Sequence, residues 1–338
     1  MIHCWLQNMY QKIYPVGNNP ACSAIPPATL SRSDCGQGRS IAGRSGGAFL
    51  RLEAARNEST AFQVAVANSA PALAKVKIAV KASRGISVRI RRVGFVPLAH
   101  HDTDVPEDEL DCRGHVPGYV PDPLFDEDHA AIAPREAAGF WISLTTHPDC
   151  RPGVHTIVVV VKPESGRVRK LQAQLQVYPL VLEPRRNFPV VQWFYNDALL
   201  DWYHFQPFEE GYWKILENYL RDLPEHGQDC VLVPLCTPPT DGVKRPTQLL
   251  RVTRAGKRYR FDWRDVKRYV ELARSCGVRY FEWNHFFSQW GAKYALRVYA
   301  NQGREEKLLW NPETPATAPI YRNFLRQLLP ELQAFLAR

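Results

Sequence analysis

The chain has 338 residues, of which 45% are hydrophobic and 23% are charged. This composition is typical of a folded globular protein with room for about two domains, and it excludes a wholly disordered chain. The formal net charge is +9, but acidic and basic residues are interleaved and no nucleic-acid-binding motif is recognised, so we predict no nucleic-acid partner.

The sequence carries no recognisable targeting segment. Its first residues, MIHCWLQNMYQKIYP, lack a charged stretch followed by an apolar core, and no run has the length and apolar character of a membrane span. We therefore expect a cytoplasmic protein without a membrane partner, or an exported one if the true amino terminus precedes Met1. The cysteines show no CxxC or His-rich spacing, so we predict no metal site, no disulfide framework and no cofactor. The oligomeric state is not predicted.

The first half of the chain has the pattern of a β-sandwich. Residues 16–47 are rich in Gly, Ser, Pro, Asn and Arg, which indicates a long surface loop. Short β-prone runs separated by turn signals such as Pro152-Gly153 then predict an antiparallel β-sandwich domain over residues 1–184. The runs cover residues 48–52, 61–67, 76–80, 87–95, 140–145, 154–161 and 171–177.

One excursion interrupts this domain. Residues 97–134 contain many Asp and Glu side chains, and carboxylates are the ligands that calcium prefers. Because no EF-hand spacing with a central glycine is present, we interpret the segment as a solvated acidic loop, with calcium binding as the alternative.

After Pro189 the pattern changes to alternating strands and helices, which is typical of parallel βα units. The predicted strands cover 190–195, 230–235 and a run that begins at 278, each followed by a helix, and a small hairpin is expected at 249–254 and 257–261. About three βα units in residues 190–338 predict an incomplete (β/α)8 TIM-type barrel, because a closed one needs about 250 residues. The predicted fold class is therefore multi-domain, β plus α/β.

Polar and aromatic side chains gather in the stretch 278–292, VRYFEWNHFFSQWGA. In βα architectures the loops after the carboxyl ends of the strands collect binding groups. We interpret Trp193 and Tyr195 on the first strand as packing residues. Asp197 fits two roles equally well, a cap for the following turn and a ligand group. The predicted substrate-binding residues from the three strand ends are Asn196, Asp197, Asp241, Glu282, His285, Gln289 and Trp290.

Several short motifs, taken in order, make the chain resemble one enzyme family. They are Lys12-Ile13-Tyr14-Pro15, Ala55-Arg56-Asn57-Glu58, Ala61-Phe62-Gln63-Val64, residues 118–124 (GYVPDPL), Phe140-Trp141-Ile142, residues 237–241 (TPPTD) and residues 285–292 (HFFSQWGA). With this order and spacing, the chain resembles glycoside hydrolase family 123, the β-N-acetylgalactosaminidase-like enzymes.

The resemblance implies an amino-terminal β-sandwich followed by a catalytic barrel that removes a terminal β-linked N-acetylhexosamine, above all N-acetylgalactosamine, and hence a role in carbohydrate metabolism. It further implies substrate-assisted retention, in which an adjacent Asp-Glu pair orients the acetamido group and supplies the general acid. In the family this pair follows the third barrel helix, which here ends close to Arg338. Asp108-Glu109 and Asp126-Glu127 share the dipeptide but match no catalytic motif.

We therefore assign no catalytic residue and expect the chain to be a fragment whose Asp-Glu pair lies beyond Arg338. On this interpretation the 338-residue chain is a glycosidase-like hydrolase fragment without activity of its own. The alternative is a non-catalytic carbohydrate-binding or adaptor protein.

Overall fold

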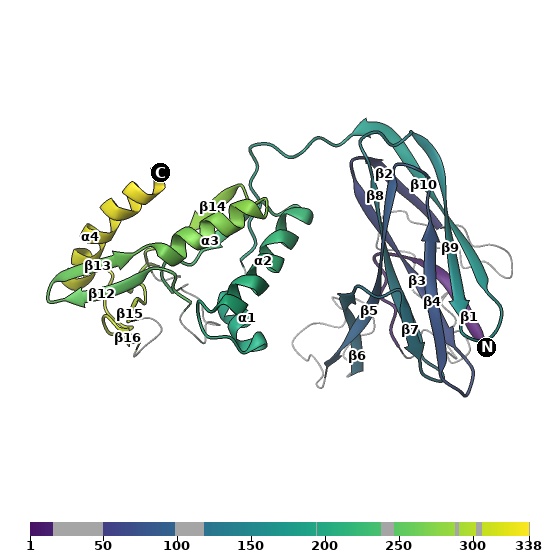
Figure 1. Ribbon diagram of the computed structural model, residues 1–338, viewed down its shortest axis with the longest axis horizontal. Coiled ribbons are helices and arrows are strands. Elements are labelled where there is room, and N and C mark those ends of the chain that lie inside the picture. Colours follow the sequence, from purple (N-terminus) through teal and green to yellow (C-terminus); the bar gives the residue numbers. More distant parts are fainter. Residues whose placement is uncertain are drawn as a thin grey trace. The chain divides into compact units, whose positions relative to one another are not determined.

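The computed structural model of the protein describes residues 1–15, 50–98, 118–193, 195–237, 247–287, 291–301 and 306–337. The chain divides into two compact units, Met1–Pro184 and Arg185–Arg338 (Figure 1). The first unit contains only strands among its described elements, and the helices α1 to α4 all belong to the second.

The first unit is built from two five-stranded sheets. One sheet is antiparallel throughout and has the order β1 (Ile2–Asn8), β3 (Ser59–Asn68), β8 (Ala137–Thr146), β5 (Ile86–Leu98) and β6 (Gly118–Phe125). The other has the order β2 (Leu50–Arg56), β10 (Arg169–Val181), β9 (Gly153–Pro163), β4 (Ala74–Lys81) and β7 (His129–Ile132). Its β10–β2 pair is parallel. The prediction of an antiparallel sandwich is therefore wrong for this pair of strands.

The two faces of β3 explain how this unit is held together. Successive side chains of a strand point to opposite faces, and Phe62 and Val64 belong to the large apolar cluster of the sandwich. Ala65 and Ala67 instead pack with Ile13 on the opposite face of the strand. Small side chains at these two positions leave room for the segment that carries Ile13.

Part of the predicted acidic loop at 97–134 is regular structure, because it contains β6 and β7. Residues 99–117 lie outside the described ranges. Just after β6, Asp126 accepts hydrogen bonds from Nε and Nη2 of Arg89 at 3.1 and 3.0 Å, and Glu127 accepts one from Nε of Arg92 at 2.6 Å. These hydrogen bonds hold the pKa of both carboxyls below the ordinary range. Two acidic residues of the interval are therefore engaged by arginines of β5.

The second unit combines four helices with small sheets. A two-stranded parallel sheet is formed by β11 (Cys230–Val233) and β14 (Tyr280–Trp283), and two antiparallel hairpins by β12 (Arg251–Ala255) with β13 (Arg258–Asp262) and by β15 (Tyr299–Ala300) with β16 (Lys307–Leu308). The helices are α1 (Asn196–Tyr203), α2 (Glu210–Glu225), α3 (Arg264–Ser275) and α4 (Pro319–Leu336). Gly227 and Gly277, which follow α2 and α3, take the left-handed conformation typical of a helix end, with φ of +82° and +99°.

The predicted incomplete (β/α)8 barrel is wrong. In the described residues, parallel pairing is confined to β11 and β14 and to one bridge between Val191 and Cys230. The predicted first strand at 190–195 is reduced to that bridge, since α1 begins at Asn196. A hairpin separates β11 from α3, and a second hairpin separates β14 from α4, so the βα repeat that defines a barrel is not maintained.

Apolar side chains of the helices and strands form one core in this unit. The cluster includes Leu216 of α2, Val266 of α3 and Leu328 of α4, together with Val231 and Val233 of β11. The helices thereby cover one face of the parallel strands and fix their carboxyl ends. None of the helices in the described ranges combines the length and the apolar character needed to span a bilayer.

Candidate functional site

The candidate site lies where three stretches of backbone run side by side. Leu232 of β11 is paired with Glu282 of β14. On the other edge of β11, Val191 forms a parallel bridge with Cys230. Trp193 lies two residues after Val191, so it is in register with Leu232 and, across β11, with Glu282. Side chains in register on neighbouring strands of a sheet point to the same face. The pairing thus places the Trp193 and Glu282 side chains on one face of the strands.

Trp193, Glu282 and His285 contact one another on this face. The indole Nε1–H of Trp193 donates a hydrogen bond of 2.8 Å to Oε2 of Glu282. The other carboxylate oxygen, Oε1, lies 3.8 Å from Nε2 of His285. The rings of Trp193 and His285 meet edge to face, with centroids 5.4 Å apart and planes at 68°. We call these three residues the Trp–Glu–His cluster.

A buried amide joins the two strands just beyond this cluster. Oδ1 of Asn284 accepts a hydrogen bond of 3.0 Å from the backbone N–H of Cys236, which fixes how the amide is turned. Its Nδ2 is buried without a hydrogen-bond partner, and so is Oγ1 of the neighbouring Thr237. A buried polar atom without a partner carries a desolvation cost, so the carboxyl ends of β11 and β14 have free hydrogen-bonding capacity.

The two thiols near the cluster are not nucleophiles. Burial raises the pKa of the Cys236 thiol to about 12. Burial also raises the pKa of Cys230, and the negative charge of Glu282 raises it further. Since the thiolate is the reactive form, both side chains stay protonated and inert at neutral pH. Among the described residues, no group of three or more His, Cys, Asp and Glu side chains is placed to hold a metal ion.

The structure brings some of the predicted site residues together and places others apart. Glu282 and His285 belong to the same cluster. Asn196 and Asp197 form the first turn of α1 and are buried, with exposed fractions of 3% and 5%. Oδ1 of Asn196 has no hydrogen-bond partner. Asp241, Gln289 and Trp290 lie outside the described residues.

Sequence reasoning missed Trp193 as a member of the cluster. It interpreted this residue as packing, yet the side chain is 36% exposed and bonded to Glu282. Its position at the carboxyl end of a β-prone run was the available signal, the same one that selected Glu282. Asn284 was also passed over, although it lies two residues after Glu282 and therefore on the same side of an extended chain.

The cluster offers groups suited to binding a polyhydroxylated ligand. A carboxylate accepts hydrogen bonds, an imidazole donates or accepts them, and an indole presents an apolar face. The side chains of Glu282 and His285 are 27% and 44% exposed, so both are within reach of a ligand in solution. A sugar needs this combination, because its ring has polar hydroxyls around an apolar C–H face.

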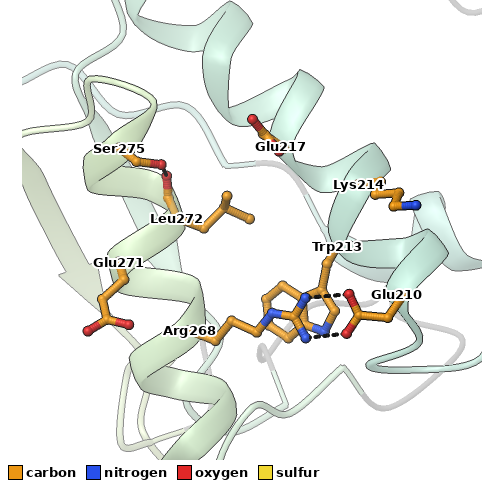
Figure 2. Close-up of a pocket in the computed structure, with 8 residues that line it drawn as sticks. All are labelled: Glu210, Trp213, Lys214, Glu217, Arg268, Glu271, Leu272 and Ser275. Atoms are coloured by element: carbon orange, nitrogen blue, oxygen red, sulfur yellow. Dashed lines mark hydrogen bonds and ion pairs between the residues drawn. The ribbon is translucent and has the colours of Figure 1, made fainter.

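A separate groove of about 370 Å³ lies between α2 and α3. In it, Arg268 makes two hydrogen bonds to the carboxylate of Glu210, of 2.6 and 2.8 Å, and its guanidinium stacks over the ring of Trp213 at 4.5 Å (Figure 2). The charges of Arg268 and Glu210 are paired with each other, and none of the predicted site residues lines the groove. We interpret this groove as a helix-packing feature.

Comparison with known proteins finds one family model that the second unit resembles. Residues 193–338 match the family described as glycoside hydrolase 123, catalytic domain. No curated protein matches the chain significantly. Among solved structures, a family 123 glycoside hydrolase from Clostridium perfringens, described for glycolipid glycan hydrolysis, aligns with a TM-score of 0.71 at 11% identity, covering 100% of this chain and 57% of that chain.

Other structural matches are confined to a smaller part of the chain. A FixG-related protein from Vibrio parahaemolyticus has a TM-score of 0.23 at 11% identity and covers 36% of this chain and 80% of its own. A PapD-like domain of human CEP192 aligns with a TM-score of 0.22 at 9% identity, and the alignment covers 38% of this chain and 82% of that domain. The chain spans little more than half the length of the family 123 structure. At 11% identity, the similarity to that structure shows a shared fold. The predicted resemblance to glycoside hydrolase family 123 is confirmed by the match of residues 193–338 to its catalytic-domain model.

Proposed function

We propose that the chain forms the substrate-binding part of a glycoside hydrolase that acts on a carbohydrate with a terminal β-linked N-acetylhexosamine. The observation that carries this proposal is the Trp–Glu–His cluster at the carboxyl ends of the parallel strands. The family match of residues 193–338 supports the same class of substrate. No nucleic acid, membrane or cofactor is part of the proposal.

In the proposed complex Glu282 and His285 hydrogen-bond the hydroxyls of the sugar. The carboxylate keeps unused lone pairs after accepting from Trp193, and His285 is exposed enough to rotate toward a ligand. Asn196 retains an unpaired buried carbonyl oxygen that suits a hydroxyl donor. We keep Asp197, Asp241, Gln289 and Trp290 as further proposed substrate-binding residues.

We assign the chemical step to no residue of this chain. Substrate-assisted retention uses the acetamido oxygen of the substrate as nucleophile, with one carboxylate to orient it and one carboxylic acid to protonate the leaving group. Residues 185–338 contain no adjacent Asp-Glu pair. We therefore propose that the 338-residue chain binds its sugar without hydrolysing it. The same observation favours the second candidate function, a non-catalytic carbohydrate-binding or adaptor protein.

The first test measures binding and hydrolysis separately on the 338-residue chain. Calorimetric titration with methyl N-acetyl-β-galactosaminide is expected to give saturable binding, and methyl β-galactoside, which lacks the acetamido group, to bind more weakly. A p-nitrophenyl N-acetyl-β-galactosaminide is expected to release no p-nitrophenol.

Each outcome has a defined meaning. Equal affinity for the two methyl glycosides would contradict the preference for an N-acetylhexosamine. Release of p-nitrophenol would contradict the non-hydrolysing state and exclude the adaptor function. Failure to bind either glycoside would overturn the proposal as a whole.

A further inference from the structure

We propose that Trp193 is a sugar-contact residue and that Glu282 is the positioning residue that holds its ring in place. The inference rests on the proposed function and adds to it a residue that neither the motifs nor the comparisons assign. It follows from how the indole is held, how much of it is exposed, and how it differs from the tryptophans packed in the core of the same unit.

The indole ring of Trp193 is more exposed than the tryptophan rings in the core of the same unit. Tryptophans that pack in the core of this unit are buried or partly buried: Trp213 and Trp310 are 3% and 7% exposed, and Trp263 and Trp283 pack partly buried against the same cluster. Trp193 is 36% exposed, although it lies beside the buried Leu232 on the strands. Trp193 is not among the side chains packed against this core. Exposure alone does not identify a contact residue, because Trp202 of α1 is 79% exposed.

The indole ring of Trp193 is also fixed in place. The indole N–H is held by Oε2 of Glu282 at 2.8 Å, and the ring meets His285 edge to face. The chain position of Trp193 is set independently by the bridge between Val191 and Cys230. A side chain fixed at its backbone and at its polar end has little freedom left to lose when a ligand binds, which is the condition for a preorganised contact.

Glu282 lies against both rings of the cluster. Oε2 accepts from the indole, and Oε1 faces Nε2 of His285 at 3.8 Å. One carboxylate therefore bonds the indole directly and lies beside the imidazole. The two rings then present an apolar face and a polar edge side by side, which matches the C–H face and the hydroxyl edge of a pyranose.

A second tryptophan–glutamate pair in the same unit provides a matched control. Nε1 of Trp263 donates to Oε2 of Glu331 at 3.1 Å. The ring of Trp263 stacks on Phe335, with centroids 4.9 Å apart and planes at 18°, so one of its faces is already covered. The hydrogen bond is the same in kind, but this ring serves contact between α4 and the start of α3.

The experiment compares four variants of the 338-residue chain, W193A, W193F, E282A and E282Q, with W263F as the control. Binding of methyl N-acetyl-β-galactosaminide is measured by calorimetry. The indole N–H signals of the 15N-tryptophan-labelled protein are recorded in parallel, and the signal missing from W193F identifies Trp193.

We expect W193A to raise the dissociation constant about tenfold, the effect of removing one aromatic contact of about 1.4 kcal/mol. W193F keeps an apolar ring but loses its anchor, so its loss is smaller. E282A should weaken binding and shift the Trp193 indole signal in the free protein. E282Q should do both to a lesser extent, because a glutamine carbonyl still accepts from the indole N–H. W263F should bind as the unaltered chain does.

Three results would overturn the inference in whole or in part. If the unaltered chain binds the glycoside while W193A binds it equally well, Trp193 is not a contact residue and the proposed function survives. If E282A weakens binding without moving the Trp193 signal, Glu282 acts only through its own hydrogen bond to the sugar and does not position the Trp193 ring. If the unaltered chain binds no glycoside, both the inference and the proposed function fail together.

Discussion

Asp229 is the residue that ties the start of the second unit to its parallel strands. Its Oδ1 accepts hydrogen bonds from the backbone N–H of Val190 at 2.9 Å and from Nη2 of Arg185 at 2.8 Å. Its backbone oxygen also accepts from the N–H groups of Arg279 and Tyr280. The segment that leads to Trp193 is therefore positioned by one carboxylate at the amino ends of the strands.

This arrangement predicts a pH-dependent contribution to stability. Burial raises the pKa of Asp229, but the bonds from Val190 and Arg185 lower it more, so the net pKa lies below the ordinary 3.8. A carboxyl with a lowered pKa in the folded state stabilises the fold above its unfolded pKa and loses that contribution as the pH falls through the lowered value. We expect D229N to unfold with a free energy about 1 to 2 kcal/mol lower at pH 7.

The measurement is urea unfolding of D229N and the unaltered chain at a series of pH values. The difference between them should shrink as the pH falls below about 4, where Asp229 takes up a proton in the unfolded state, and should vanish once the pH is below the lowered pKa of the folded state. R185A is the matched control, because it removes one donor and leaves the bond from Val190. A difference that stays constant between pH 7 and pH 3 would contradict the role assigned to the carboxylate.

How far the site is predictable depends on the sequence separation of its members. Glu282 and His285 are three residues apart, and their type and position after a β-prone run were sufficient to select them. Trp193 is 89 residues from Glu282, and its partner follows only from the pairing of β11 with both neighbours. No local pattern contains that pairing, which is why the same residue was interpreted as packing.

At the scale of elements, the strands of the sandwich that the sequence did not predict share a position. β1, β6 and β7 each lie at the edge of a sheet. An edge strand has a neighbouring strand on one side only. Its sequence can therefore depart further from the apolar, β-branched pattern by which inner strands are predicted. β6 even contains Pro121 and Pro123, which read as loop residues but are tolerated where one side of the strand needs no hydrogen bonds. The inner strands β3, β8, β5, β10, β9 and β4 were all predicted, and of the edge strands only β2 was.

Helix α4 offers a prediction at this scale, because one ring docks it on the hairpin β12–β13. Phe324 is 1% exposed and meets the rings of Tyr259, Phe261, Trp310 and Tyr321 at centroid distances of 5.2 to 6.1 Å. We expect F324A to lower the free energy of unfolding of the second unit by about 3 to 5 kcal/mol, since the cavity cannot close around aromatic neighbours.

The control for F324A lies on the same helix. Leu329 is 43% exposed, so L329A should change the free energy of unfolding by about 0.5 kcal/mol or less. Chemical denaturation followed by far-UV circular dichroism measures both variants. A similar loss in the two would mean that α4 is held by its helical propensity and not by docking through Phe324.

At the scale of the whole molecule, the two units have separate cores. The apolar cluster of the first unit draws its members from residues 54–177, and that of the second from residues 199–332. The boundary at Pro184 and Arg185 falls between them. Because hydrophobic burial is the dominant stabilising term, each cluster is expected to unfold as its own cooperative element.

This separation is tested by a pair of core substitutions followed in one calorimetric scan. Phe140 is fully buried in the sandwich, and F140A is expected to lower the midpoint of one unfolding transition by about 10 °C while leaving the other in place. F324A should do the reverse, and V154A, at a position 62% exposed on β9, should move neither. A single transition that shifts with both F140A and F324A would mean that the two cores unfold together. In that case the sandwich and the sugar-binding unit would be coupled in stability, and a substitution in either would affect glycan binding through the other.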